Sequence, residues 1–87
     1  MDSEQRIIEH FGAEHQTVVA MEEMAELTKE LSKHLRGQSN REAIIEEMAD
    51  VMICLAEQRY IHHIDLNDVL VVMVEKLERM KERMAND

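Results

Sequence analysis

The sequence predicts an all-α protein with a four-helix bundle-like core, made of a short first helix and three longer ones. The chain has no Pro, only 2 Gly and 2% aromatic residues, which leaves few sharp turns for a many-stranded sheet. Its apolar fraction of 45% is enough for folding, and the apolar residues recur at helical spacing. With 87 residues we expect one domain over 1–87, whose modest core would gain from self-association.

The first two helices are delimited by glycines. Residues 3–11 form a short helix that Gly12 ends, and a second helix runs from Ala13 or Glu14 to about Leu35. Gly37 follows at the position of a left-handed cap. The second helix is amphipathic, because one of its sides carries Met21, Met24, Leu27, Thr28, Leu31 and Leu35.

The last two helices are predicted from their starting residues. A Ser39-x-x-Glu42 capping box opens a third helix that runs to about Tyr60. Residues 51–56 of this helix are apolar nearly all round, which predicts a central helix covered on more than one side. Asp65 caps a fourth helix that runs to about Met84. Its apolar residues form a seam for helix–helix packing, made of Leu66, Leu70, Met73, Leu77, Met80 and Met84.

The charge balance restricts the classes of partner. The chain holds 19 acidic against 10 basic residues, a net charge of −9, so a nucleic-acid polymer and an anionic membrane surface are disfavoured. No apolar run approaches the roughly 18 residues of a membrane span, and the N-terminus does not resemble a signal peptide. A single cysteine, Cys54, allows no internal disulfide and is expected to be a small core residue. We therefore expect a cytoplasmic protein.

Two groups of acidic residues fall on the second and third helices. Glu22, Glu23 and Glu26 lie on the second, and Glu47 and Asp50 lie on the third. Spacing of three residues puts two side chains on one face of a helix, so antiparallel neighbours could gather these carboxylates into one pocket. Such a pocket suits Mg²⁺, although acidic pairs are also common on solvated helix faces. Asp50 borders the covered apolar segment. Burying an unpaired carboxylate there costs free energy, so a partner for its charge is expected, and a metal ion is one candidate.

Residues 16–27 and 46–51 resemble the MazG-like family of all-α nucleoside triphosphate pyrophosphohydrolases. The family pattern is E-E-x-x-E, a spacer, then E-x-x-D, and here the spacer of twenty residues runs from 27 to 46. The basic segment that begins at Lys76 also looks like the end of these domains. The resemblance covers nearly the whole chain, from about Phe11 to Arg83.

The resemblance implies a four-helix core assembled as a homodimer or homotetramer. It also implies Mg²⁺, with Mn²⁺ as a substitute, and cleavage of a nucleoside triphosphate to the monophosphate and pyrophosphate. Lys76 and Arg79 would contact phosphate, and Glu22 would be an extra ligand, a partner of a ligand, or a helper for the attacking water. By motif position, the metal ligands would be Glu23, Glu26, Glu47 and Asp50.

Other interpretations of the sequence stay open. Gln16 either contacts the nucleotide or simply lies in the first turns of the second helix. In place of a hydrolase, the chain could be a non-catalytic interaction protein that associates through the seam of its fourth helix. It could also bind nucleotides as a sensor without turning them over. Mg²⁺ binding separates the interaction protein from the other two functions, because a ligand of the folded form raises its melting temperature.

Overall fold

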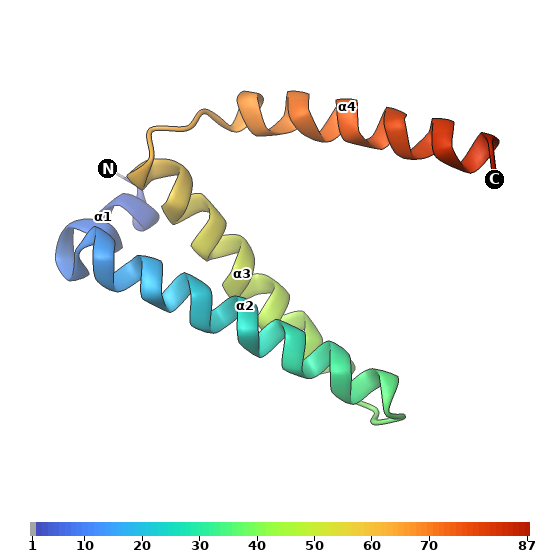
Figure 1. The fold of residues 1–87 in the computed structure, drawn as a ribbon. Coiled ribbons are helices and arrows are strands. Elements are labelled where there is room, and N and C mark those ends of the chain that lie inside the picture. Colours follow the sequence, from blue (N-terminus) through green and yellow to red (C-terminus); the bar gives the residue numbers. More distant parts are fainter. Residues whose placement is uncertain (1) are drawn as a thin grey trace.

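The computed structural model describes residues 2–87 and shows four helices (Figure 1). These are α1 (Ser3–Phe11), α2 (Ala13–Leu35), α3 (Arg41–Ile61) and α4 (Leu66–Ala85). No strand occurs in residues 2–87, so the predicted all-α class, with one short and three longer helices, is confirmed. Within that part of the chain, no helix has the length and apolarity needed to cross a lipid bilayer.

Local signals set most of the helix ends. Gly12 and Gly37 both adopt φ +92°, a conformation that glycine reaches without strain, and the two predicted stops are confirmed. After α2, the N–H of Gln38 donates to the carbonyl of Lys33 at 3.1 Å, which closes the helix end. At the end of α3, His63 takes the equivalent place with φ +54°, a left-handed conformation that is strained for a residue with a side chain.

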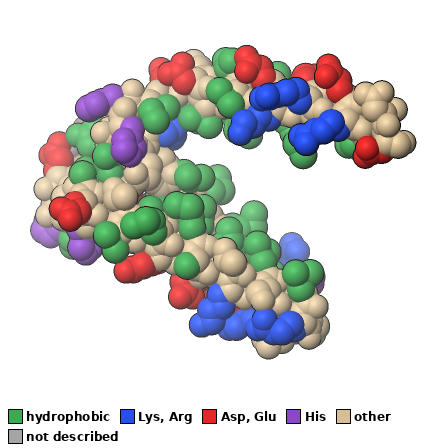
Figure 2. Space-filling view, viewed as in Figure 1, with side chains coloured by type: hydrophobic (Ala, Val, Ile, Leu, Met, Phe, Trp, Pro, Cys, Tyr) green, Lys and Arg blue, Asp and Glu red, His purple; other side chains and the backbone are tan. Residues whose placement is uncertain are grey.

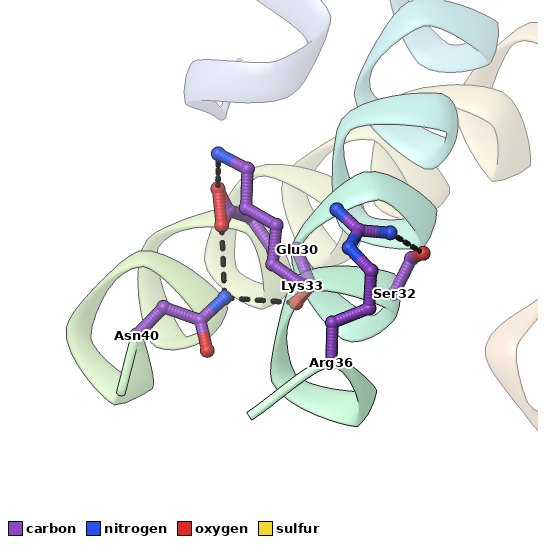
Figure 3. A network of polar contacts seen from close by, with 5 residues as sticks. All are labelled: Glu30, Ser32, Lys33, Arg36 and Asn40. Carbon is purple, nitrogen blue, oxygen red and sulfur yellow. Dashed lines mark hydrogen bonds and ion pairs between the residues drawn. The ribbon is translucent and has the colours of Figure 1, made fainter. Parts of the chain in front are cut away.

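The start of α3 differs from the prediction. The expected capping box is wrong, because the helix begins after Asn40 and no side chain caps its first turn. The Asn40 amide instead donates to the carbonyl of Glu30 at 2.8 Å and to its carboxylate at 3.0 Å (Figure 3). Lys33 donates to the same carboxylate at 3.1 Å. A contact between helices therefore fixes this turn, whereas Asp65 caps α4 as predicted by accepting from the N–H of Asn67 at 2.8 Å.

The four helices do not close into a bundle within one chain. α2 and α3 form a long antiparallel hairpin, and α1 packs against both at the end away from the α2–α3 turn (Figure 1). α4 leaves the end of α3 as a separate arm that contributes no buried residue. The radius of gyration is 16.1 Å, against about 12 Å for a compact domain of this length. The chain is therefore open.

Most of the apolar side chains predicted to form a core are exposed. The buried apolar residues among those described are Ile8, Ala20 and Cys54. α3 is consequently not central within one chain, and the prediction that residues 51–56 are covered on several sides is wrong for the isolated chain. We call six of the exposed apolar residues of the hairpin its apolar face: Met21, Met24, Leu31, Met48, Met52 and Leu55. Six of the exposed apolar residues of the arm are the α4 seam: Leu66, Leu70, Met73, Leu77, Met80 and Met84.

The single chain exposes more surface to solvent than a compact protein of the same mass does. Its accessible surface is 7065 Å², about 1,700 Å² more than the roughly 5,300 Å² of a compact protein of 10.2 kDa. Hydrophobic side chains gather along the inner sides of the open shape (Figure 2). Between α3 and α4, Met52, Leu55, Leu66, Val69 and Met73 line an apolar groove of about 530 Å³. Both walls of this opening are therefore suited to further packing.

Candidate metal centre

A line of polar residues occupies the side of α2 that faces α3. Gln16, Glu23 and Glu30 recur every seven residues, which is close to two helical turns. Gln16 and Glu30 are buried, with 6% and 9% of their surface exposed. Gln16 contacts Glu57, and Glu30 contacts Asn40, so the residues of this line meet polar partners on or next to α3. We call this line of contacts the polar seam of the hairpin.

Three carboxylates meet at the middle of the polar seam. Glu23 on α2 and Glu47 and Asp50 on α3 each place one carboxylate oxygen within 4.8 Å of the others. We call these three residues the carboxylate cluster. One turn away, Ala20 and Cys54 are 1% and 4% exposed, and their small side chains let the two helices approach closely. This approach explains how acids from two helices reach the same place.

The electrostatics of the carboxylate cluster favour a bound cation. Partial burial, followed by the negative charge of Asp50 and hydrogen bonding with Glu47 and Asp50, raises the pKa of Glu23 above its ordinary value. The Oε2 atom of Glu47 is buried and has no hydrogen-bond partner. Within residues 2–87 the ion pairs are Lys33–Glu30 and Lys81–Glu78, and neither involves the cluster. The buried Oε2 atom of Glu47, beside two other acids, therefore has no positively charged partner.

The donor set fits a hard divalent cation. Carboxylate oxygens are preferred by Mg²⁺ and Mn²⁺, and Mg²⁺ retains several waters besides a few protein ligands. Glu26 does not belong to the cluster and is exposed. Three residues along a helix amount to about 300°, so Glu26 points about 60° away from Glu23 around α2. Glu22 is likewise exposed and outside the cluster.

The predicted substrate contacts fall in two different places. Gln16 is buried; its amide nitrogen donates to Glu57 at 3.0 Å, and its amide oxygen lies 2.7 Å from Nδ1 of His15. Lys76 and Arg79 are exposed on α4, where they line an open hollow together with Arg83. Because α4 does not pack against the hairpin, one chain does not bring these two bases to the carboxylate cluster.

Two further residues complete the description of the polar seam. Burial, and then the charges of Glu57, Glu23 and Asp50, raise the pKa of the Cys54 thiol, so it stays protonated and is no nucleophile. Glu57 is a site residue that the acidic motifs of the sequence do not include. It continues the line of Glu47, Asp50 and Cys54 along α3 at alternating steps of three and four, which was the available signal.

The raised pKa of Glu23 predicts a pH-dependent effect of Mg²⁺ on stability. A folded-state pKa above the unfolded value means that the proton stabilises the metal-free fold, fully at low pH and progressively less as pH rises through the folded pKa. Mg²⁺ takes the place of that proton. The rise in melting temperature caused by Mg²⁺ should therefore be largest near about pH 7.5 and shrink towards about pH 5. Thermal melts followed by circular dichroism measure it.

A matched control for this measurement is Glu46→Gln. Glu46 is an exposed acid next to the carboxylate cluster but outside it, so its removal should leave the Mg²⁺ effect and its pH dependence intact. A Mg²⁺ effect of equal size at both pH values would contradict a coupling between proton and metal at Glu23.

Comparison with known proteins gives one positive result. Residues 11–84 match the family model described as MazG nucleotide pyrophosphohydrolase domain. The matched span contains the whole carboxylate cluster and nearly all of α4. Searches of curated proteins and of solved structures found no match.

Proposed function

The chain belongs to the MazG nucleotide pyrophosphohydrolase family, and from this premise we propose that it hydrolyses a nucleoside triphosphate to the monophosphate and pyrophosphate. The proposed reaction depends on Mg²⁺, or Mn²⁺ in its place, with Glu23, Glu47 and Asp50 as protein ligands and with Glu26, about one helical turn from Glu23, as a further ligand. The observation that carries this proposal is the carboxylate cluster, in which three acids from two helices meet within 4.8 Å. The buried, unpaired oxygen of Glu47 supports it.

The chemistry follows from the charges on the substrate. A divalent cation at the cluster supplies the positive charge that attracts the phosphates and polarises a water. In the proposed reaction the water oxygen bonds to the α-phosphorus, and the bond to the bridging oxygen breaks, so that pyrophosphate leaves with the bonding electrons. Glu22, exposed beside Glu23, is our proposed acceptor for the proton of that water. We propose that Gln16 contacts the nucleotide only at the edge of the site, because its amide is engaged within the protein.

The phosphate-binding bases are proposed to come from a second copy of the chain. Residues 76–83 hold four basic and two acidic residues, in a chain whose net charge is −9. A guanidinium such as that of Arg79 binds phosphate through paired hydrogen bonds, and Lys76 adds a second positive charge. Since α4 extends away from its own hairpin, we propose that it delivers both bases to the cluster of a partner.

The exposed surface supports a homodimer or homotetramer. A stable interface typically covers about 800 Å² on each partner. The excess accessible surface of this chain, about 1,700 Å² above that of a compact protein, is enough for more than one such contact. The apolar face of the hairpin and the α4 seam are the two surfaces that would be covered. We place the assembled enzyme in the cytoplasm, where Cys54 stays reduced.

The test is release of pyrophosphate from a panel of ribo- and deoxyribonucleoside triphosphates, with Mg²⁺ and with a chelator. We expect turnover of at least one of them, only when Mg²⁺ is present. A rise in melting temperature with Mg²⁺ and nucleotide but no pyrophosphate would identify a sensor instead. No effect of Mg²⁺ on either measurement would identify a helical interaction protein and overturn the proposal.

A further inference from the structure

The polar seam holds a buried carboxylate for which the proposed reaction has no use. Glu57 on α3 is 2% exposed. Its two oxygens lie 3.0 and 3.4 Å from the amide nitrogen of Gln16 on α2, which donates to them. Burying a carboxylate is costly unless hydrogen bonds compensate it. A carboxyl group kept at this cost between two packed helices calls for a reason other than packing.

The position of this contact relates it to the carboxylate cluster. Gln16 comes seven residues before Glu23, and Glu57 comes seven residues after Asp50, which places their contact about 10 Å along the helices from the cluster. At the opposite end, Glu30 comes seven residues after Glu23 and contacts Asn40. The cluster is thus bracketed by two buried polar contacts, each of which joins α2 to α3 or to its start.

The geometry of the cluster depends on how α2 and α3 are held together. One of its acids is on α2 and the other two are on α3, so any change in the spacing or axial alignment of the helices changes the distances between their oxygens. Mg²⁺ requires near-octahedral ligands at about 2.0–2.1 Å, whereas Ca²⁺ accepts irregular ligands at about 2.3–2.6 Å. A displacement of a few tenths of an ångström therefore penalises Mg²⁺ more than Ca²⁺.

We propose that Gln16 and Glu57 are a positioning pair, which fixes the spacing of α2 and α3 at the carboxylate cluster and thereby its preference for Mg²⁺ over Ca²⁺. An amide–carboxylate hydrogen bond is directional and holds one alignment, while an apolar contact at the same place allows the helices to slide. At the other end of the Gln16 amide, Nδ1 of His15 donates to the amide oxygen at 2.7 Å and so fixes the orientation of the amide. The inference rests on the metal site of the proposed function.

The experiment compares the binding of two metals by the full-length protein, using titration calorimetry with MgCl₂ and with CaCl₂. In Gln16→Ala and Glu57→Ala, we expect the Mg²⁺ dissociation constant to rise about 10-fold or more and that of Ca²⁺ to rise less than about 3-fold. The double variant Gln16→Glu with Glu57→Gln restores an amide–carboxylate pair with the roles exchanged. This double variant should recover most of the wild-type ratio of the Ca²⁺ dissociation constant to the Mg²⁺ dissociation constant.

The control for lost stability is Ile8→Ala. Ile8 is a buried apolar residue of α1 and is not a member of the polar seam, so this variant should melt at a lower temperature but keep the wild-type ratio of the two dissociation constants. Equal losses for both metals, or an unrestored ratio in the double variant, would show that the pair is merely structural. If Glu57→Ala does not fold, Gln16→Ala and the double variant decide the question. Absence of Mg²⁺ binding in the wild type would overturn the proposed function itself, a result distinct from an unchanged ratio.

Discussion

Asp50→Asn and Glu47→Gln are each expected to slow the release of pyrophosphate at least about 100-fold. Each substitution keeps the size of the side chain but removes the negative charge of one proposed ligand. The rise in melting temperature caused by Mg²⁺ should be lost at the same time. Without metal, both variants should melt no lower than the wild type, because one of three crowded negative charges has gone.

This combination separates loss of the metal from loss of the fold. A variant that is inactive because it unfolds would melt at a lower temperature in the absence of Mg²⁺, which is the opposite of the expected result. Glu46→Gln, at the exposed acid beside the cluster, is the matched control and should retain full turnover. Wild-type rates in both Asp50→Asn and Glu47→Gln would remove these residues from the site.

Charged substitutions in the α4 seam are expected to have the second large effect. Leu70→Asp and Leu77→Asp would bury a carboxylate at an apolar contact, at a cost of several kcal/mol for each chain. We expect the proposed oligomer to separate into monomers in analytical ultracentrifugation, and the release of pyrophosphate to fall to background. Calorimetric Mg²⁺ binding should persist, because the carboxylate cluster lies wholly within the hairpin of one chain.

Mixing two inactive variants tests whether α4 acts on a partner. Asp50→Asn lacks a metal ligand and Arg79→Ala lacks a phosphate contact, so each should be inactive alone. In randomly mixed dimers, half of the pairs contain both variants and restore one site in two, which gives about a quarter of the wild-type rate. Lys81→Ala serves as a control, since Lys81 pairs with Glu78 at 3.2 Å on the same helix. No recovery in the mixture would mean that each chain builds its own site.

The helices were predictable because their ends depend on nearby residues. Gly12, Gly37 and Asp65 each act through a backbone conformation or a hydrogen bond within a few positions. The start of α3 was mispredicted because Asn40 binds Glu30, ten residues earlier, and not the first turn of its own helix. Capping patterns contain no information about such a contact between helices.

The site was only partly predictable for a related reason. The spacing of acids indicated that two helices contribute carboxylates, and the structure gathers Glu23, Glu47 and Asp50. Whether Glu26 joins them depends on the rotation of α2 about its axis, which the pattern does not fix. The Gln16–Glu57 contact joins residues 41 positions apart and has no local signature.

The hydrophobic pattern predicted the helices correctly, but it did not predict what packs against their apolar sides. Met21 and Met24 belong to an apolar stripe predicted to pack, yet they are 57% and 41% exposed, while the polar seam faces α3. Periodicity identifies an apolar side of a helix without identifying what lies against it. In this chain, no other helix among residues 2–87 covers Met21 and Met24, which remain exposed.

In the proposed dimeric hydrolase, the uncovered apolar face and α4 seam would make nucleotide hydrolysis depend on the number of chains in a cell. If a working site needs two copies, then below the dissociation constant the amount of active enzyme falls with the square of the chain concentration. Halving synthesis would cut activity about fourfold in that range, and dilution by growth would silence it before the protein itself disappeared. Under the proposed function, an open monomer would thus give the cell a threshold: sparse chains would leave triphosphates untouched, and abundant ones would consume them.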